Sequence, residues 1–184
     1  MKTYNSLDSK SLSTKYILRC PFKIQGKCQS RIIALESPTS ISKYQAILKS
    51  PHEEFKFLSI KEGESNEIGY FESDDESTHH SQLFYKFASM WDFDNIGVSR
   101  PVSTMDTLIT LTTNADDKDK EHQTPIHIQF SRFLTCADCD RGPLGFSGFV
   151  INDVDSWEAN GRKVAVEKPE DMVYFFCIDS CIYE

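Results

Sequence analysis

The stretch Cys136-Ala-Asp-Cys-Asp-Arg-Gly-Pro-Leu-Gly145 contains two cysteines separated by two residues and followed by a Gly-Pro-x-Gly turn. This short spacing lets both thiolates face one ion, and the glycines let the backbone turn tightly beneath it. The stretch therefore has the pattern of one half of a tetrahedral zinc site. Because half a site cannot hold zinc alone, the two remaining ligands must lie elsewhere in the chain.

Two further cysteines, Cys20 and Cys28, lie more than a hundred residues upstream and are the candidates for the other half. Seven residues separate them, where a zinc knuckle usually has about two to four. The alternatives for the downstream pair are two buried thiols or a redox dithiol. A redox dithiol usually opens a helix, whereas this pair follows a predicted strand. We therefore expect one structural zinc, held by Cys20, Cys28, Cys136 and Cys139.

The remaining cysteines, Cys177 and Cys181, are four residues apart. They could supply ligands if one upstream cysteine is not used. The simpler expectation is that Cys177 belongs to the core of a strand and that Cys181 is partly exposed.

Length and charge limit the possible classes of protein. The 184 residues fit a single domain with a sizeable core. A net charge of -8 argues against a nucleic-acid partner and against electrostatic docking on an anionic membrane. Residues 1–14 lack the apolar core of a signal or anchor, and no run approaches the ~18 apolar residues of a membrane span. We therefore predict a cytoplasmic protein, in whose reducing compartment the six cysteines are not expected to form disulfides. The protein is also expected to be a monomer.

Short apolar runs alternate with turn residues along the chain, which favours strands over helices. Strands are expected at 15–20, 30–35, 44–48, 55–60, 105–112, 126–130, 144–151, 163–167 and 172–178, with a strand or short helix at 83–90. Residues 1–14 are predicted as a disordered tail, and the polar stretches 61–80 and 114–124 as solvated insertions. The prediction is one mainly β domain over residues 15–184, with little helix.

No set of nucleophile, base and orienting group stands out. The histidines lie in or beside polar loops, except for His127, which occupies a polar position in an alternating strand. Phosphate-binding and dinucleotide-binding glycine patterns are missing from the sequence. We therefore expect a protein that is not an enzyme.

Another segment mixes aromatic and acidic side chains: Trp91, Asp92, Phe93, Asp94, Asn95, Ile96, Gly97 and Val98. In a strand, Trp91, Phe93 and Asn95 would share one face. Two interpretations are open. The segment is an ordinary edge strand with its aromatics inward, or a binding strand whose aromatics anchor a partner and whose acids select it.

Residues 90–98 and 133–145 together resemble the Rab-interacting-factor (Mss/Dss) family, small zinc proteins found as suppressors of secretion mutants. The resemblance implies a β-tent fold of twisted antiparallel sheets stapled by one four-cysteine zinc. It also implies binding to nucleotide-free or GDP-bound Rab GTPases of the exocytic pathway, with slow GDP release, so that many members are described as Rab chaperones. By position, the zinc ligands would be the four cysteines above, and the Rab-contacting segment Trp91 to Val98. The longer loop between Cys20 and Cys28 departs from the family pattern.

Two alternatives belong to other classes. One is a zinc-stapled β-tent interaction or ligand-binding module without exchange activity. The other is an enzyme similar to methionine-sulfoxide reductases of the B type, because Phe175-Phe-Cys-Ile-Asp-Ser180 faintly resembles their Arg-x-Cys-x-Asn-Ser segment. This chain has Phe175 and Asp179 where those enzymes have arginine and asparagine.

Overall fold

The computed structural model describes residues 2–7, 15–36, 43–48, 57–61, 67–70, 80–101, 107–113, 125–164 and 168–184. The strands are β1 (Tyr16–Arg19), β2 (Arg31–Leu35), β3 (Lys43–Leu48), β4 (Leu58–Lys61), β5 (Glu67–Tyr70), β6 (His80–Phe87), β7 (Ile96–Val98), β8 (Leu108–Thr113), β9 (Ile126–Cys136), β10 (Gly145–Ile151), β11 (Met172–Cys177) and β12 (Ile182–Tyr183). The described helices are α1 (Val154–Ala159) and the 3-10 turns η1 (Tyr4–Ser6), η3 (Pro21–Lys23), η5 (Met90–Asp92), η7 (Pro169–Asp171) and η8 (Ile178–Ser180). The prediction of a mainly β, antiparallel fold with little helix is confirmed.

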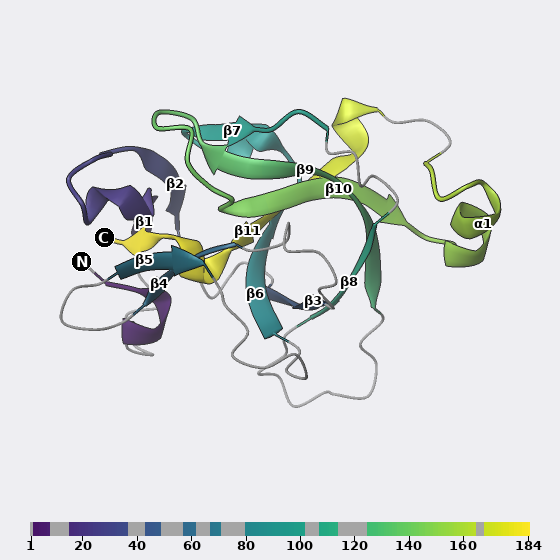
Figure 1. Ribbon diagram of the computed structural model, residues 1–184, viewed down its shortest axis with the longest axis horizontal. Helices are drawn as coiled ribbons and strands as arrows, with labels where there is room; N and C mark the ends of the chain where they lie inside the picture. The colour runs from purple at the N-terminus through teal and green to yellow at the C-terminus, as the bar shows by residue number, and fades with distance from the viewer. Residues whose placement is uncertain are drawn as a thin grey trace.

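Six strands form a sheet that closes on itself. The order is β10-β11-β6-β3-β8-β9, and β9 also pairs with β10, so the first and last strands meet. Figure 1 shows these strands arranged around a common interior. Every pairing is antiparallel. The short strand β7 pairs with the last residues of β9, on the edge away from β10. Closure pairs each of the six strands on both sides.

Aromatic side chains fill the inside of the closed sheet. Phe146 of β10 stacks on Phe175 of β11 at 5.0 Å between ring centroids, and it meets Phe84 of β6 edge-on at 5.3 Å. Phe130 of β9 completes the cluster. Because neighbouring residues of a strand point to opposite faces, Tyr174 and Phe176 of β11 face outward into a second core.

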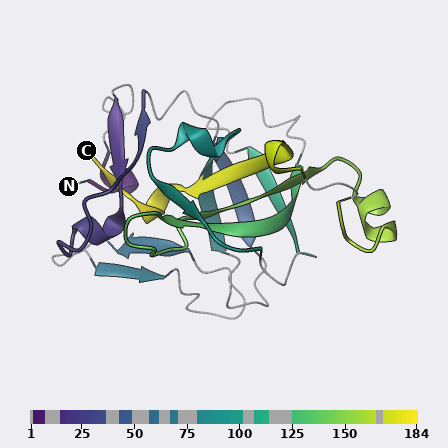
Figure 2. The ribbon, with the colours of Figure 1, turned by 90° about the horizontal axis from the view of Figure 1, so that it is seen from above.

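The second core lies between the closed sheet and a small sheet of order β12-β1-β2. In this small sheet the last strand pairs with the first, and Lys2 bridges to Tyr183, so both chain ends lie side by side (Figure 2). Tyr183 contacts the rings of Tyr4 and Tyr16. The small sheet therefore assembles from the two ends of the chain.

Some predicted boundaries differ from the structure. Residues 2–7, in the predicted tail, form η1 and the bridge to Tyr183. Residues 67–70, in the predicted insertion, form β5, which pairs with β4. The rest of the predicted tail, most of 61–80, and 114–124 lie outside the described residues. The predicted strand at 163–167 is wrong for residues 163 and 164, which are irregular, and its residues 165–167 lie outside the described residues. The helix α1 was not predicted. Within the described residues, no helix has the length and apolarity needed to cross a membrane.

Gly145 is needed where β10 and β11 approach each other. A Cβ atom at this position would lie 2.1 Å from the Phe175 carbonyl oxygen, which is a backbone atom and cannot move aside without breaking the sheet. This contact explains the last glycine of the Gly-Pro-Leu-Gly motif.

We predict that Gly145→Ala lowers the free energy of unfolding by about 1–3 kcal/mol, because the added methyl group overpacks the sheet. Val150→Ala, at a partly exposed position of the same strand, is the control and should change stability less. Urea unfolding followed by circular dichroism measures both. Equal stability of Gly145→Ala and the unmodified chain would contradict the steric explanation.

Candidate metal centre and the adjoining segment

The first two cysteines of the predicted site lie at the end of a hairpin. Strands β1 and β2 are antiparallel, Cys20 follows β1, and Cys28 lies shortly before β2. The Cys20 amide donates to the Ser30 carbonyl at 3.1 Å, which closes the hairpin around the intervening loop. The long spacing between these cysteines is therefore compatible with their meeting in space.

The other two cysteines lie where β9 ends. Cys136 is the last residue of β9, and the chain turns immediately after it, with the Asp140 amide donating to the Cys136 carbonyl at 2.8 Å. Asp140 takes a left-handed conformation with φ of 57°. This turn brings Cys139 back beside Cys136.

All four sulfur atoms converge. The Sγ atoms of Cys20 and Cys139 are 3.7 Å apart, as are those of Cys28 and Cys136, and all four lie within 4.8 Å of one another. A tetrahedral ion with zinc–sulfur bonds of ~2.3 Å requires sulfur atoms ~3.8 Å apart. The donor set and its spacing therefore fit one zinc-sized ion, and the four residues predicted from sequence are those that meet.

The thiols influence one another strongly. Hydrogen bonds from the Cys20 thiol and from the Asp138 and Cys139 amides lower the pKa of Cys136 to about 4. The bond to Cys136, together with burial, raises the pKa of Cys20, while burial raises the pKa of Cys139 to about 11. The cluster thus favours a thiolate at Cys136 beside protonated thiols at Cys20 and Cys139, and a divalent cation would displace these protons.

Cys177 and Cys181 lie outside this cluster. Both are buried, so the expectation that Cys181 is partly exposed is wrong; its exposed fraction is 1 %. Burial raises the pKa of Cys177 to about 12. A buried, protonated thiol is a poor nucleophile, which argues against the sulfoxide-reductase alternative.

The segment Trp91 to Val98 is not a continuous strand. Residues 90–92 form the 3-10 turn η5, and only Ile96–Val98 is strand. The prediction that Trp91 and Phe93 share a face is wrong, since Trp91 is 85 % exposed and Phe93 is 8 % exposed. The turn changes the direction of successive side chains, which the alternating pattern could not reveal.

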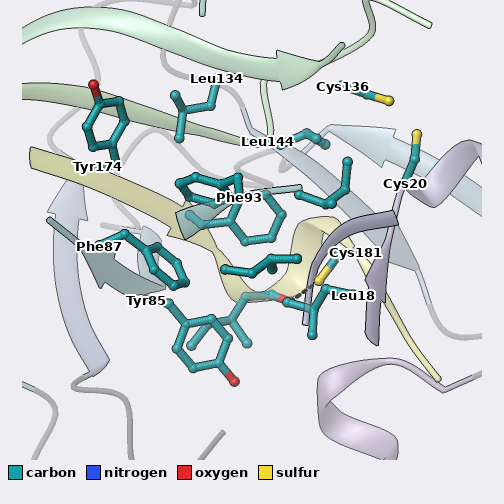
Figure 3. Close-up of a cluster of buried hydrophobic side chains, with 14 of the residues drawn as sticks. Leu18, Cys20, Tyr85, Phe87, Phe93, Leu134, Cys136, Leu144, Tyr174 and Cys181 are labelled. Atoms are coloured by element: carbon teal, nitrogen blue, oxygen red, sulfur yellow. Dashed lines mark hydrogen bonds between the residues drawn. The ribbon is translucent and has the colours of Figure 1, made fainter. Parts of the chain in front are cut away.

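Phe93 belongs to the second core. Its ring lies 4.7 Å from that of Phe87 and 6.0 Å from that of Phe176. Figure 3 shows it in the middle of the cluster, with Leu144 on one side and the Cys20 and Cys136 side chains further along. Phe93 therefore attaches the segment Trp91 to Val98 to the second core.

Trp91 is presented on a capped turn. Its amide donates to Ser89 Oγ at 3.1 Å, and the Ser89 amide donates to Asp92 Oδ2 at 3.2 Å. This reciprocal capping box satisfies amides that the short turn leaves free. An exposed indole thus projects from backbone that is held in place.

The segment is fastened to both halves of the metal centre. On the Cys28 side, the Asp94 amide donates to the Ile32 carbonyl at 2.8 Å, Arg31 Nη2 contacts Asp94 Oδ1 at 2.5 Å, and Asn95 Nδ2 donates to Ser30 Oγ at 2.7 Å. On the other side, Ile96 pairs with Cys136 itself. The supporting role of residues 30–32 was not predicted, because a backbone carbonyl and single polar side chains at the start of a strand carry no distinguishing sequence signal.

The fold and the site define a class: a mainly β protein in which the closed sheet and the small β12-β1-β2 sheet meet at a four-cysteine centre able to hold one metal ion. The family model described as "Mss4 protein" matches residues 20–166, and the chain belongs to this family. The matched range includes the four cysteines and the segment Trp91 to Val98. Among curated proteins, "Protein DSS4" of Saccharomyces cerevisiae is 28 % identical over 138 residues, which cover 74 % of this chain and 82 % of that protein. No solved structure matches the chain.

Membership of this family supports, at family level, a role as a Rab-interacting exchange factor or chaperone. Such proteins regulate GTPases rather than catalyse covalent chemistry. The resemblance to this family found in the sequence is confirmed.

We predict that Cys28→Ser lowers the bound metal per chain, whereas Cys181→Ser leaves it unchanged, because only the first is one of the converging sulfurs. Metal content by atomic absorption after purification in zinc-containing buffer measures both. Equal metal loss in both variants would contradict the assignment of ligands.

We also predict that Phe93→Ala lowers the free energy of unfolding by about 3–5 kcal/mol, since it opens a cavity in the core. Trp91→Ala should change it by less than ~0.5 kcal/mol, as expected for an exposed side chain. Thermal and urea unfolding of the two variants provide the test. A large loss in Trp91→Ala would mean that the indole is packed in solution.

Proposed function

We propose that the chain binds a Rab-family GTPase in its nucleotide-free or GDP-bound form, promotes GDP release and stabilises the emptied GTPase. The observation that supports this most directly is the exposed Trp91 on its capped turn, with the Asp92 carboxylate beside it. An exposed tryptophan on fixed backbone loses little conformational freedom on binding, and tryptophan is among the residues most enriched at energetic centres of interfaces.

Exchange needs no catalytic acid or base. A factor that binds the empty GTPase more tightly than the loaded one must, by linkage, weaken nucleotide binding to the same extent. The segment suits this task because Trp91 offers apolar contact, while the negative charge of the neighbouring Asp92 would repel a returning phosphate in the proposed complex. These residues disfavour the nucleotide-bound GTPase by competing with the nucleotide for its binding site. They do not make or break a covalent bond.

We further propose that the metal at the four-cysteine centre is a single structural zinc. Four thiolates form a closed site without a position for substrate. Three of the cysteines are buried and Cys139 is half-buried, and the ion would cross-link β1–β2 to β9. When bound, zinc would supply cross-linking and charge neutralisation, on the order of several kcal/mol of folding free energy.

The contributions of the segment's residues are expected to differ. Trp91 is exposed and available to a partner. Asp92 is exposed too, but one of its carboxylate oxygens accepts from the Ser89 amide and caps the turn. Phe93 and Asp94 are engaged within the protein, by the second core and by Arg31 and Ile32 respectively. Substitution of this second pair would report folding as well as binding, so it is unsuitable as a first test.

The test is release of a fluorescent GDP analogue from a panel of exocytic Rabs. We expect the unmodified chain to accelerate release from at least one of them, and Trp91→Ala to reduce the acceleration at least ~10-fold, as at an interface hot spot. Asp92→Asn tests the charge, and Val150→Ala, at another exposed apolar position, is the control. Acceleration that is unchanged in Trp91→Ala would refute the site, and binding to empty Rab without release would favour the non-exchanging interaction module.

A further inference from the structure

The loop between Cys20 and Cys28 is too long for its length alone to hold the two ligands in place. Within it, η3 and a bond from the Gly26 amide to the Lys23 carbonyl at 2.9 Å fix the local backbone. These contacts do not fix the loop relative to the rest of the centre. Restraints from outside the loop must do so.

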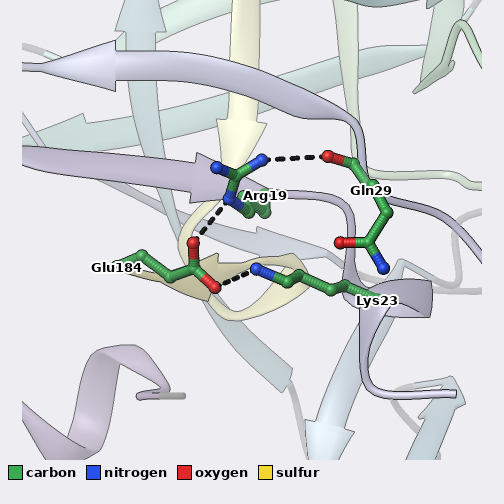
Figure 4. A network of polar contacts seen from close by, with 4 residues as sticks. All are labelled: Arg19, Lys23, Gln29 and Glu184. Atoms are coloured by element: carbon green, nitrogen blue, oxygen red, sulfur yellow. Dashed lines mark hydrogen bonds and ion pairs between the residues drawn. The ribbon is translucent and has the colours of Figure 1, made fainter. Parts of the chain in front are cut away.

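One such restraint is the side chain of Glu184. Its Oε2 accepts from Arg19 Nε at 2.6 Å, and its Oε1 accepts from Lys23 Nζ. Arg19 Nη1 also donates to the Gln29 carbonyl at 2.9 Å. Figure 4 shows the four residues, with Glu184 between the two cationic side chains.

These contacts span the whole ligand loop. Arg19 immediately precedes Cys20, Gln29 immediately follows Cys28, and Lys23 lies between them. One carboxylate and one guanidinium therefore connect the start, middle and end of the loop. Arginine suits this position because its planar group donates in two directions at once.

The carboxylate is itself fixed in place. The main chain of Glu184 exchanges two hydrogen bonds with Ile17 of β1, at 2.8 and 3.0 Å. Its side chain is 31 % exposed and that of Arg19 is 24 % exposed. An isolated surface ion pair contributes little because its side chains are free to move, whereas this network joins two cations on a held backbone.

A second contact secures the far side of the loop. The Arg141 guanidinium lies over the Phe22 ring at 4.5 Å from its centroid. Phe22 belongs to the first ligand loop, and Arg141 follows the Cys136–Cys139 turn. This cation–π contact joins the two halves of the centre directly.

We propose that Glu184 is a positioning residue for the four-cysteine centre: by holding Arg19 and Lys23 it keeps Cys20 and Cys28 at the spacing that a metal requires, and thereby slows metal loss. The inference rests on the proposed zinc but not on the proposed action on Rab. Groups that orient metal ligands commonly change metal affinity 10–100-fold when they are replaced.

The experiment measures zinc release from the full-length protein into an excess of a chromogenic chelator. Glu184→Gln keeps the shape of the side chain and removes its charge, and we expect release about 10-fold faster. Glu36→Gln is the matched control. Glu36 pairs with Lys15 at 2.7 Å, at the end of the β1–β2 hairpin that lies away from the cysteines. Its release rate should stay within about twofold of the unmodified chain.

A second variant and a spectroscopic measurement separate positioning from general stability. Arg19→Lys retains the charge but not the two-directional donation, and it should also accelerate release. Cobalt loaded in place of zinc should give an altered absorption spectrum in Glu184→Gln and not in Glu36→Gln, since only the former loosens ligand geometry. Unchanged release in both Glu184→Gln and Arg19→Lys, or equal acceleration in Glu36→Gln, would overturn the inference. An unmodified chain that binds no zinc would instead refute the zinc proposal on which it rests.

Discussion

The convergence of four sulfur atoms is the constraint on which the arrangement of the two sheets depends. Cys20 and Cys28 belong to a hairpin made near the start of the chain. Cys136 ends the longest described strand, and Cys139 lies in the turn that follows it. The Sγ atoms of the two cysteine pairs lie 3.7 Å apart across the sheets, a distance that can be kept only while the small sheet packs against the closed one. The second core fills the space between the sheets, and Leu144, Leu134 and Phe93 lie in it beside the cysteines. Hydrophobic packing and the polar centre therefore fix the same geometry.

The position of the segment Trp91 to Val98 depends on this four-cysteine centre. It is bonded to residues that follow Cys28 and paired with Cys136, so a shift of either half would move it. Phe93 ties it to the core, and the adjacent Trp91 is left in solvent. The same short run of sequence thus contains one side chain that stabilises the fold and one that is free for a partner.

The sequence was most informative where chemistry and spacing are restrictive. Two cysteines separated by two residues and followed by Gly-Pro predict a metal-binding turn. Cys20 and Cys28 were the expected partners, and the structure brings these two, rather than Cys177 or Cys181, to the turn. The sequence was less informative where tertiary contacts determine the backbone conformation and the pairing of strands. Alternation suggested a strand at 91–95, but a capping box at Ser89 and Asp92 turns the chain there. The closure of the sheet through β9 and β10 was not predictable, because a list of strands does not contain their pairing. The support from Glu184 was likewise hidden, since it joins residues 165 positions apart in the chain.

The closed sheet limits how any partner can be recognised. Each of its six strands already exchanges main-chain hydrogen bonds with a neighbour on both sides. A peptide or protein that binds by adding a strand needs a row of unsatisfied backbone groups. Among the described residues, the closed strands leave only short stretches paired on one side, such as residues 80–83 of β6, which pair with β3 alone. Closure also removes the sheet edges through which β proteins tend to associate with one another. The closed sheet therefore favours recognition by side chains, and its selectivity can change by substitution in a turn without any change to the strands beneath.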